Sequence, residues 1–341
     1  MMRKEMSWVV RVPLLRYMNR LFYIQVNCYC IRSDISASCC NLLCSFTCRN
    51  KRPGSIYNTS SKCYMISVIQ AIAASDILIA QFEDIYDKYP NCSSLGYLID
   101  LLRGVIRKGR YKKNRSENTQ ILNQLILEIK WNKCSQQDAF EIMTAIWKSI
   151  SDNLKIYGKF FLPMKIKLIH SFKGIDVTNK IQNYLGLSLG LCGNYHERPG
   201  VILEYLIDQH FQPSLIDGNP NKTSNITIYE KAPEILLLHI QANKWDDFSG
   251  VMVKPIYYIL YEENMTLWLD IAQDLMRNKV HRQKLVYNLK SVVSHSGNIS
   301  QGHYVTYRTF RGKWFKVDDE TVTEIQFDKK ISPYILIYEK L

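Results

Sequence analysis

The sequence predicts an α+β fold, with helices in the first half of the chain and β-strands toward the C-terminus. Apolar residues recur at helical spacing after residue 63 and again after residue 138. Alternating, strand-like runs follow over residues 285–317. With 341 residues, 47% of them hydrophobic, the chain can bury the core of one large domain or of two ordinary ones. This composition excludes a globally disordered, collagenous or coiled-coil protein.

The first 54 residues differ from the rest of the chain. They hold nine basic and two acidic side chains, and six of the ten cysteines lie within residues 28–48. Their uncharged stretches are too short to span a bilayer. We predict a poorly ordered, basic, cysteine-rich extension of unknown role over residues 1–54, which ends in a linker, and a folded domain over residues 55–341. A mitochondrial transit peptide is an alternative, as is a metal site at Cys28, Cys30, Cys39 and Cys40, although paired C-x-x-C spacing is missing.

The net charge of +13 is confined to two segments. Residues 1–54 contribute a net +7, and residues 103–115 contribute seven basic side chains without an acidic one, so the remainder is nearly neutral. We interpret residues 103–115 as a solvated loop or helix face, with contact to nucleic-acid phosphate or an acidic partner as the alternative. We therefore expect no nucleic-acid partner and no membrane. The scattered remaining cysteines indicate a reduced, intracellular protein, cytoplasmic or nuclear.

A cysteine begins the first predicted helix. The polar residues 55–62 lead into an apolar run in which Tyr64, Val68 and Ile72 have helical spacing. Cys63 then lies in the first turn, where the helix dipole favours a thiolate over a thiol. Such a thiolate is a good nucleophile when a histidine can reach it. A small buried core cysteine is the alternative.

The C-terminal region supplies a histidine and two carboxylates. Residues 285–293 have the pattern of a strand, residues 295–302 that of a polar loop, residues 303–310 that of a second strand, and residues 311–312 that of a turn into 313–317. His303 begins a strand directly after a glycine, and Asp318 and Asp319 end the next strand. A hairpin can bring such a carboxylate beside the histidine and fix its tautomer. Cysteine, histidine and aspartate in this order are the parts of a thiol protease.

Four segments together resemble the ubiquitin-specific protease family of papain-like cysteine deubiquitinases. They are the residues around Cys63, the run Gln-Gln-Asp-Ala-Phe-Glu over residues 136–141, the region of His303, and the ending Pro-Tyr-Ile-Leu-Ile-Tyr over residues 333–338. The resemblance implies a papain-like fold with a helical thumb that carries Cys63 and a β-rich palm that carries His303 and Asp318. It also implies β-rich fingers, drawn from residues 160–230, that grip ubiquitin.

The resemblance assigns catalytic roles to individual residues. It implies that Cys63 is the nucleophile, His303 the general base, and Asp318 the residue that orients the histidine, with Asp319 as the less favoured candidate. Asn58 matches the asparagine whose side-chain amide completes the oxyanion hole, where one hydrogen-bond donor is worth about 3–4 kcal/mol. The implied reaction is hydrolysis of the peptide or isopeptide bond after the C-terminal glycine of ubiquitin, with ubiquitin or ubiquitinated proteins as partners and without a cofactor.

Four further residues match positions that contact the substrate in the family: Gln137, Asp138, Gly302 and Tyr304. For Asp138 an ordinary acidic residue at a helix N-terminus is an equal alternative. Ser135 is expected to cap that helix, whose buried stripe includes Ala139, Ile146 and Ile150.

We expect no structural zinc. Many relatives carry two C-x-x-C pairs in the fingers, whereas the corresponding segments, residues 166–171 and 214–218, contain no cysteine. The remaining candidates, His170, Cys192 and His196, lack the spacing of a tetrahedral site.

The chain departs from the family pattern around the nucleophile and before the histidine. Ser60-Ser61-Lys62 replaces Gly-Asn-Thr, Ile66 replaces an asparagine, and Gln301 replaces the first of two glycines. Serine in place of glycine predicts backbone strain in the oxyanion loop, and we expect Lys62 to be solvated. These departures motivate the alternative function, a catalytically weak or inactive ubiquitin-binding module that keeps the fold.

Overall fold

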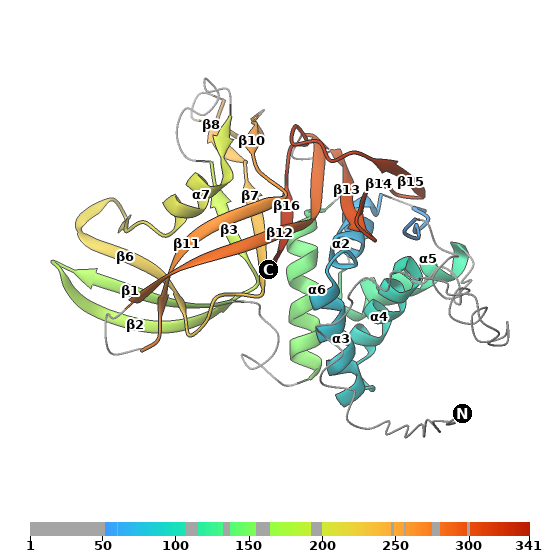
Figure 1. Cartoon of the computed structure of the whole chain (residues 1–341), viewed down its shortest axis with the longest axis horizontal. Coiled ribbons are helices and arrows are strands. Elements are labelled where there is room, and N and C mark those ends of the chain that lie inside the picture. Colours follow the sequence, from blue (N-terminus) through green and yellow to red (C-terminus); the bar gives the residue numbers. More distant parts are fainter. Residues whose placement is uncertain are drawn as a thin grey trace, which may run out of the picture. The chain divides into compact units, whose positions relative to one another are not determined.

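Five helices of the described residues follow one another along the chain and form one lobe (Figure 1). They are α2 (Cys63–Ile72), α3 (Asp76–Lys88), α4 (Ser93–Ile106), α5 (Arg115–Glu128) and α6 (Ala139–Asn153). This lobe is the predicted thumb. Cys63 is the first residue of α2, as its position in the sequence predicts.

The structure is a computed structural model that describes residues 52–59, 61–106, 115–131, 137–154, 164–191, 200–246, 249–255, 257–274, 280–298 and 301–341. Nearly all of the predicted extension and most of the basic stretch after residue 103 lie outside these ranges. So do Ser60, Ser135, Gln136, Cys192 and His196. The interpretations given above for these segments therefore stay predictions, apart from the cap expected at Ser135, which the described start of α6 decides.

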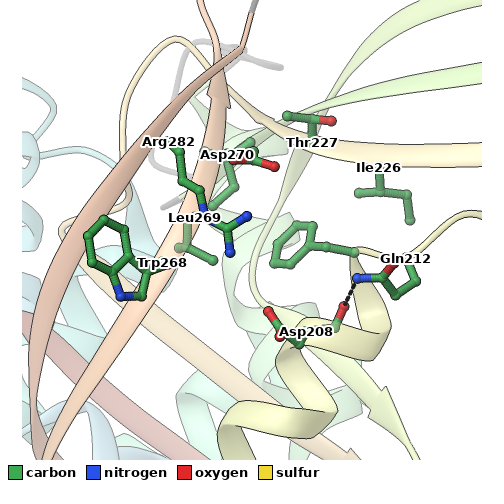
Figure 2. A pocket seen from close by; sticks show the side chains of 10 residues that line it. Asp208, Gln212, Ile226, Thr227, Trp268, Leu269, Asp270 and Arg282 are labelled. Carbon is green, nitrogen blue, oxygen red and sulfur yellow. Dashed lines mark hydrogen bonds between the residues drawn. The ribbon is translucent and has the colours of Figure 1, made fainter.

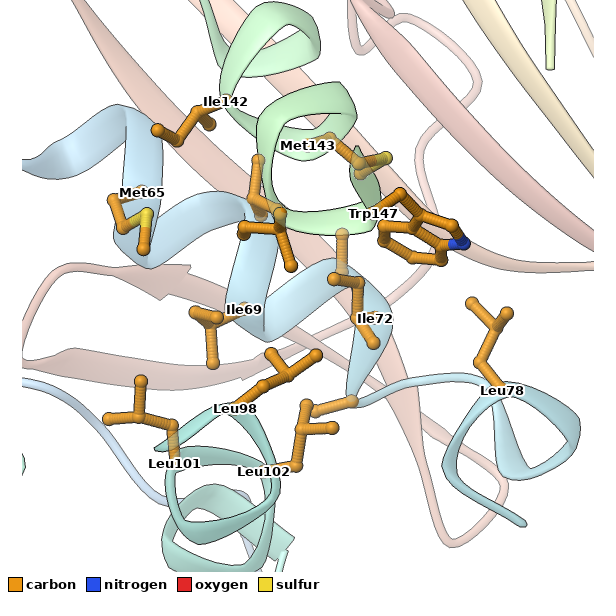
Figure 3. Packing of buried hydrophobic residues seen from close by; sticks show 14 of the residues in the cluster. Met65, Ile69, Ile72, Leu78, Leu98, Leu101, Leu102, Ile142, Met143 and Trp147 are labelled. Atoms are coloured by element: carbon orange, nitrogen blue, oxygen red, sulfur yellow. The ribbon is translucent and has the colours of Figure 1, made fainter. Parts of the chain in front are cut away.

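The helix α2 is the centre of the thumb core. All ten of its residues are buried, because most of them are apolar and its polar residues Ser67 and Gln70 have hydrogen-bond partners within the protein. Figure 3 shows Met65 and Ile69 of α2 between side chains of α4, such as Leu98, and side chains of α6, such as Ile142. Burial of each such side chain contributes about 1.5–3 kcal/mol. The nucleophile is therefore carried by the most tightly enclosed helix of the lobe.

Strands form the second part of the domain. The main sheet has the order β15-β14-β13-β12-β11-β6-β1-β2, and β3, β5, β7 and β16 attach to it. Its strands are β1 (Met164–Phe172), β2 (Ile175–Tyr184), β3 (Leu187–Gly190), β5 (Ser214–Ile216), β6 (Asn219–Tyr229), β7 (Ile235–Gln241), β11 (Asn264–Ala272), β12 (Val280–Gly297), β13 (Gly302–Phe310), β14 (Lys313–Asp318), β15 (Thr321–Ile325) and β16 (Ile335–Lys340). The pairs β4 (Val201–Ile202) with β10 (Ile259–Leu260) and β8 (Lys244–Asp246) with β9 (Val251–Val253) are separate, and α7 (Leu203–His210) follows β4.

The two strands that carry the predicted histidine and aspartate, β13 and β14, are antiparallel neighbours. Strand β13 pairs with β12 on one side and β14 on the other. The turn between β13 and β14 uses Arg311 and Gly312, both with positive φ, as the sequence predicts for a tight turn. The loop predicted over residues 295–302 is shorter than expected, because β12 continues to Gly297 and pairs Ser296 with His303.

Three polar side chains of the sheet bind the backbone of the α2 segment. The Thr306 hydroxyl donates to the Ser67 carbonyl at 2.9 Å, and the Ser291 hydroxyl donates to the Ala71 carbonyl at 3.2 Å. Arg308 is buried and donates to the Gln70 side chain at 2.9 Å and to the Ala73 carbonyl. These contacts set the position of α2 against β12 and β13, and so of Cys63 against His303.

The region predicted as fingers is built from β1, β2, β5 and β6, which pair in antiparallel order (Figure 1). The packing of the domain begins before the predicted boundary, since the Gly54 amide donates to the Val105 carbonyl at 2.7 Å. Among the described residues, no single helix is long and apolar enough to cross a membrane. By length and composition alone, α2 and α3 pass that test as a pair bent by 92°.

Candidate active site

Cys63 lies at the N-terminus of α2 and is a buried cysteine outside any disulfide, with 4% of its surface exposed. Burial raises the pKa of its thiol, and the negative charge of Asp319 adds to the rise. Hydrogen bonds from the backbone of Tyr304 and Tyr64 act in the opposite direction on this pKa without cancelling the effect of burial. The preference of the helix dipole for a thiolate thus does not bring the pKa of Cys63 below its ordinary value, and the thiol needs a base.

His303 and Asp318 form the predicted pair. The His303 Nε2 atom lies 2.6 Å from Asp318 Oδ1. Since Nε2 faces the carboxylate, Nδ1 is the ring nitrogen that remains for a reacting group. Tyr304 follows His303 directly, and its backbone binds the Cys63 thiol. The residue after His303 is therefore in contact with Cys63. Asp318, rather than Asp319, is the carboxylate bonded to the histidine.

Asn58 and Asp319 form a second pair beside the first. The Asn58 amide donates to Asp319 Oδ2 at 2.9 Å, while Asn58 Oδ1 accepts from the Lys62 amide at 3.1 Å. The Asn58 side chain therefore crosses the segment that leads into Cys63, and its amide group carries a second N–H. Burial raises the pKa of Asp319, and the hydrogen bond from Asn58 opposes that rise. Asp319 thus holds the residue predicted for the oxyanion hole.

Asp138 is the N-cap of α6, the helix for which Ser135 was the expected cap. Its Oδ1 accepts from the amides of Phe140 at 2.7 Å and of Glu141 at 3.0 Å, while the Tyr334 hydroxyl donates to its Oδ2. The expectation for Ser135 is wrong because α6 begins four residues after it. Both oxygens of Asp138 have protein partners, which favours the structural interpretation of this residue over the substrate-binding one.

The other predicted substrate contacts lie just before α6 (Gln137) and on β13 (Gly302 and Tyr304). Gln137 precedes the Asp138 cap and is partly exposed. Gly302 lies against His295, since a Cβ atom added there would come within 2.2 Å of His295 Nε2. Tyr304 is 5% exposed, so in this conformation it reaches the site through its backbone.

A cluster of aromatic and basic side chains lies next to Asp138 and Tyr304. Sequence reasoning missed this cluster. His295 packs on Tyr304 with ring centroids 4.3 Å apart, and Lys254 Nζ lies 2.6 Å from His295 Nδ1. His239 stacks on Phe140 at 4.2 Å. Burial lowers the pKa of both histidines to about 4, so both are neutral near pH 7.

The signal for this cluster was weak in the sequence. Lys254 and His239 lie in segments far from the recognisable motifs. Tyr334 belongs to the C-terminal segment whose resemblance to the family was noted, but its contact with Asp138 could not be read from spacing.

The departures from the family pattern are accommodated locally. Ser61 has φ +42°, so the residue in the left-handed region is Ser61, while Ser60 lies outside the described residues. Lys62 points to α5, where its Nζ donates to Asn123 Oδ1 at 2.8 Å. Ile66 is buried in the core of α2. Gln301 closes a turn, since its amide donates to Asn298 Oδ1 at 2.7 Å.

One group of metal-binding residue types occurs among the described residues. It consists of His303, Asp318 and Asp319, whose ligand atoms lie within 4.8 Å of one another. Lys316 Nζ lies 3.0 Å from Asp318 Oδ2, and this ammonium group would repel a metal cation. We therefore assign these side chains to acid–base chemistry and not to a metal centre.

A pocket lies elsewhere, between α7, β6 and the β11–β12 hairpin (Figure 2). Figure 2 shows Asp208 and Gln212 from the α7 region facing Trp268 and Arg282 from β11 and β12. It contains none of the predicted catalytic residues. The chemistry is thus expected at the meeting of α2 with β13 and β14.

Comparison with known proteins gives one family. The sequence profile described as "Ubiquitin carboxyl-terminal hydrolase" matches residues 55–338. The chain is 21% identical over 307 residues to the probable ubiquitin carboxyl-terminal hydrolase 8 of Schizosaccharomyces pombe, covering 84% of this chain and 64% of that protein. It is 28% identical over 255 residues to human ubiquitin carboxyl-terminal hydrolase 3, covering 71% and 46% of the two chains. The chain thus spans about half to two thirds of the length of these relatives.

Among solved structures, the fold is similar to a chain of the SAGA Ubp8/Sgf11/Sus1/Sgf73 DUB module bound to ubiquitin aldehyde. The TM-score is 0.69 with 18% identity, over 91% of this chain and 76% of that one. A second structure of a SAGA DUB module, bound to monoubiquitin, gives a TM-score of 0.65 with 20% identity over 89% and 74%. The α+β, papain-like architecture predicted from the sequence is confirmed.

Proposed function

The chain belongs to the ubiquitin carboxyl-terminal hydrolase family, and from this premise we propose that it is a thiol-dependent hydrolase that cleaves the peptide or isopeptide bond after the C-terminal glycine of ubiquitin. The observation that carries the proposal is the hydrogen bond between His303 Nε2 and Asp318 Oδ1. The residue after His303 is Tyr304, whose backbone binds the Cys63 thiol. These contacts support Cys63 of α2 as the nucleophile, and His303 and Asp318 of the neighbouring strands β13 and β14 as base and orienting carboxylate.

The chemistry follows from this arrangement. Cys63 begins as a neutral thiol, since burial raises its pKa, and gives its proton to His303 Nδ1 as the sulfur attacks the glycine carbonyl carbon. Asp318 stabilises the imidazolium that forms. The C–N bond breaks as His303 passes the proton to the leaving amine. His303 then takes a proton from water as the water attacks the thioester carbonyl, and it returns this proton to the Cys63 sulfur as the C–S bond breaks.

The developing oxyanion needs donors near the N-terminus of α2. The amide of Cys63 lies at the first turn, where the helix dipole favours negative charge. The Asn58 side chain, held by Asp319, is the proposed second donor. This part of the site distinguishes an active enzyme from a fold that only binds ubiquitin.

We further propose that the protein acts inside the cell, in the cytoplasm or nucleus, on ubiquitin or ubiquitinated proteins. The proposal is supported by the reduced thiol of Cys63, since thiols stay reduced in these compartments. The SAGA module structures with a similar fold are described as bound to ubiquitin aldehyde and to monoubiquitin, which supports ubiquitin as the substrate here.

The test is covalent labelling by ubiquitin that carries a C-terminal alkyne electrophile. We expect the full chain to gain one ubiquitin, and Cys63→Ala to abolish labelling and to lower hydrolysis of a ubiquitin C-terminal amide by at least about 10³-fold. Cys92→Ala is the matched control, because Cys92 is also a buried cysteine in no disulfide yet lies outside the site. Tight ubiquitin binding without labelling would support the alternative, a non-catalytic ubiquitin-binding module.

A further inference from the structure

Lys316 shares the Asp318 carboxylate with His303. The two residues Lys316 and Asp318 are two positions apart on β14, so their side chains project from the same face of the sheet. Lys316 Nζ lies 3.0 Å from Asp318 Oδ2, while His303 Nε2 lies 2.6 Å from Oδ1. Each carboxylate oxygen therefore has its own partner, and rotation of the group would break both contacts.

The sheet fixes the lysine in this position. On β13, Tyr307 is the residue directly opposite Lys316, and on β15 the residue opposite is Thr323. Strand β14 is thus paired on both sides at Lys316, which leaves its backbone little freedom. The side chains of Lys316 and Asp318 are 40% and 31% exposed, so water screens the pair only in part.

We propose that Lys316 is a positioning residue, which holds the Asp318 carboxylate with Oδ1 turned toward His303. Lys316 also disfavours the protonated, positively charged form of the histidine ring. The inference rests on the proposed function, because it assigns Lys316 to the same site. Such a residue acts on the reaction through Asp318 and touches neither the thiol nor the substrate.

The electrostatics of Asp318 support this role. Burial alone would raise the pKa of Asp318, but hydrogen bonds from His303 and Lys316 lower it below its usual value. The hydrogen bond with Asp318 in turn raises the pKa of Lys316. The lysine therefore keeps the carboxylate ionised and partly offsets its negative charge.

Other charged or titratable groups also surround this pair. Tyr307 on β13 interacts with Lys316, and Asp319 after β14 interacts with Asp318, His303, Glu320 and Cys63. His295 on β12 interacts with His303, and Lys254 Nζ lies 2.6 Å from His295 Nδ1. Of these, Asp319 favours a positive histidine ring, while His295 is neutral near pH 7. Lys316 is thus a cation that contacts Asp318 directly and disfavours protonation of the His303 ring.

The sign of the effect follows. Without the ammonium group, the whole charge of Asp318 acts on the histidine, and a nearby positive charge is removed as well. Both changes favour the imidazolium, so the limb of the pH–rate profile that reports His303 ionisation moves to higher pH. Removal of the partly screened Lys316 charge from beside Asp318 corresponds to a shift of the His303 limb by about 0.5 pH unit.

The experiment compares Lys316→Met, Lys316→Arg and Lys313→Met in the full chain. Lys313 is on the same strand and pairs with exposed Glu324, so its variant is the matched control. We expect Lys316→Met to shift the limb upward by about 0.5 pH unit and to lower kcat/KM about three- to tenfold. Arginine is expected to restore the limb, and the control to leave it in place.

A second readout does not need the reaction. The ring signal of His303, assigned with His303→Gln in histidine-labelled protein, is followed by NMR against pH. Its midpoint is expected to rise in Lys316→Met and not in Lys313→Met, even if the chain hydrolyses nothing, in which case the proposed function fails while the effect of Lys316 on His303 stands. An active enzyme whose pH profile and ring titration are both unchanged in Lys316→Met would overturn the inference.

Discussion

The two sides of the site are built in opposite ways. On the helix side Cys63 is 4% exposed and begins a helix whose ten residues are all buried. On the hairpin side the His303 and Asp318 side chains are 42% and 31% exposed and are held by polar contacts. Packing and buried hydrogen bonds to the α2 segment therefore position the nucleophile, whereas partly exposed hydrogen bonds and charges position the base.

This difference has a chemical consequence. Burial keeps the thiol neutral by raising its pKa, since a thiolate is poorly solvated there. The hairpin side can carry a positive histidine because water and Asp318 both stabilise it. Changes on the helix side should therefore affect stability most, and changes on the hairpin side should affect catalysis most.

The largest expected effect on the helix side comes from Arg308→Met. Arg308 is buried and donates to Gln70 and to the Ala73 carbonyl, and burial lowers its pKa to about 9. Methionine fills similar space but leaves both acceptors unpaired in the core. We expect the free energy of unfolding to fall by about 2–4 kcal/mol, measured by urea denaturation.

The matched control is Arg282→Met, because Arg282 is exposed on β12. It should change the unfolding free energy by less than about 0.5 kcal/mol. In the folded fraction of Arg308→Met, labelling of Cys63 by the ubiquitin electrophile is expected to persist. A loss below about 1 kcal/mol would mean that packing without this arginine holds α2 in place.

A smaller effect is expected on the hairpin side from Asp319→Ala. The variant frees the Asn58 amide, so kcat/KM should fall about tenfold. Stability should not fall: burial raises the pKa of Asp319, so its ionisation favours the unfolded state at any pH above that raised value. Steady-state hydrolysis and thermal unfolding at pH 7 measure the two quantities.

Glu320→Ala controls for the loss of a neighbouring charge, because Glu320 is exposed next to Asp319. It should leave kcat/KM within about twofold of the native chain. If Asp319→Ala lost stability and activity together, the hairpin side would depend on packing as the helix side does, and the comparison would fail.

How much of this the sequence predicted differs between the two sides. The helix from Cys63, the turn at residues 311–312 and the strand from His303 were predictable because each depends on local spacing and turn residues. The contact between the His303 and Asp318 side chains was predictable because both residues lie at the open end of one hairpin, beyond its paired residues Thr306 and Val317. Local patterns are enough where neighbouring residues decide the structure.

Contacts between distant segments were not predictable. Arg308 in an apolar strand gave no sign that its guanidinium would bind the end of α2. Asp319 looked like a weaker candidate for the role of Asp318, yet it holds Asn58, 261 residues away. The N-cap of α6 was misassigned because Ser135 and Asp138 are both good capping residues and only the helix start distinguishes them.

The smallest effect is expected from Lys62→Met, which tests the outer surface of the helix side. Lys62 directly precedes Cys63, but its ammonium group binds Asn123 on α5 at 2.8 Å. We therefore expect the rate of Cys63 labelling to change by less than about twofold and the unfolding free energy by about 0.5 kcal/mol. Asn123→Ala, which removes the partner and leaves residue 62 intact, should have the same small effect. If Lys62→Met slowed labelling more than about tenfold while Asn123→Ala did not, the lysine would act on the thiol. Charge as well as packing would then position the nucleophile.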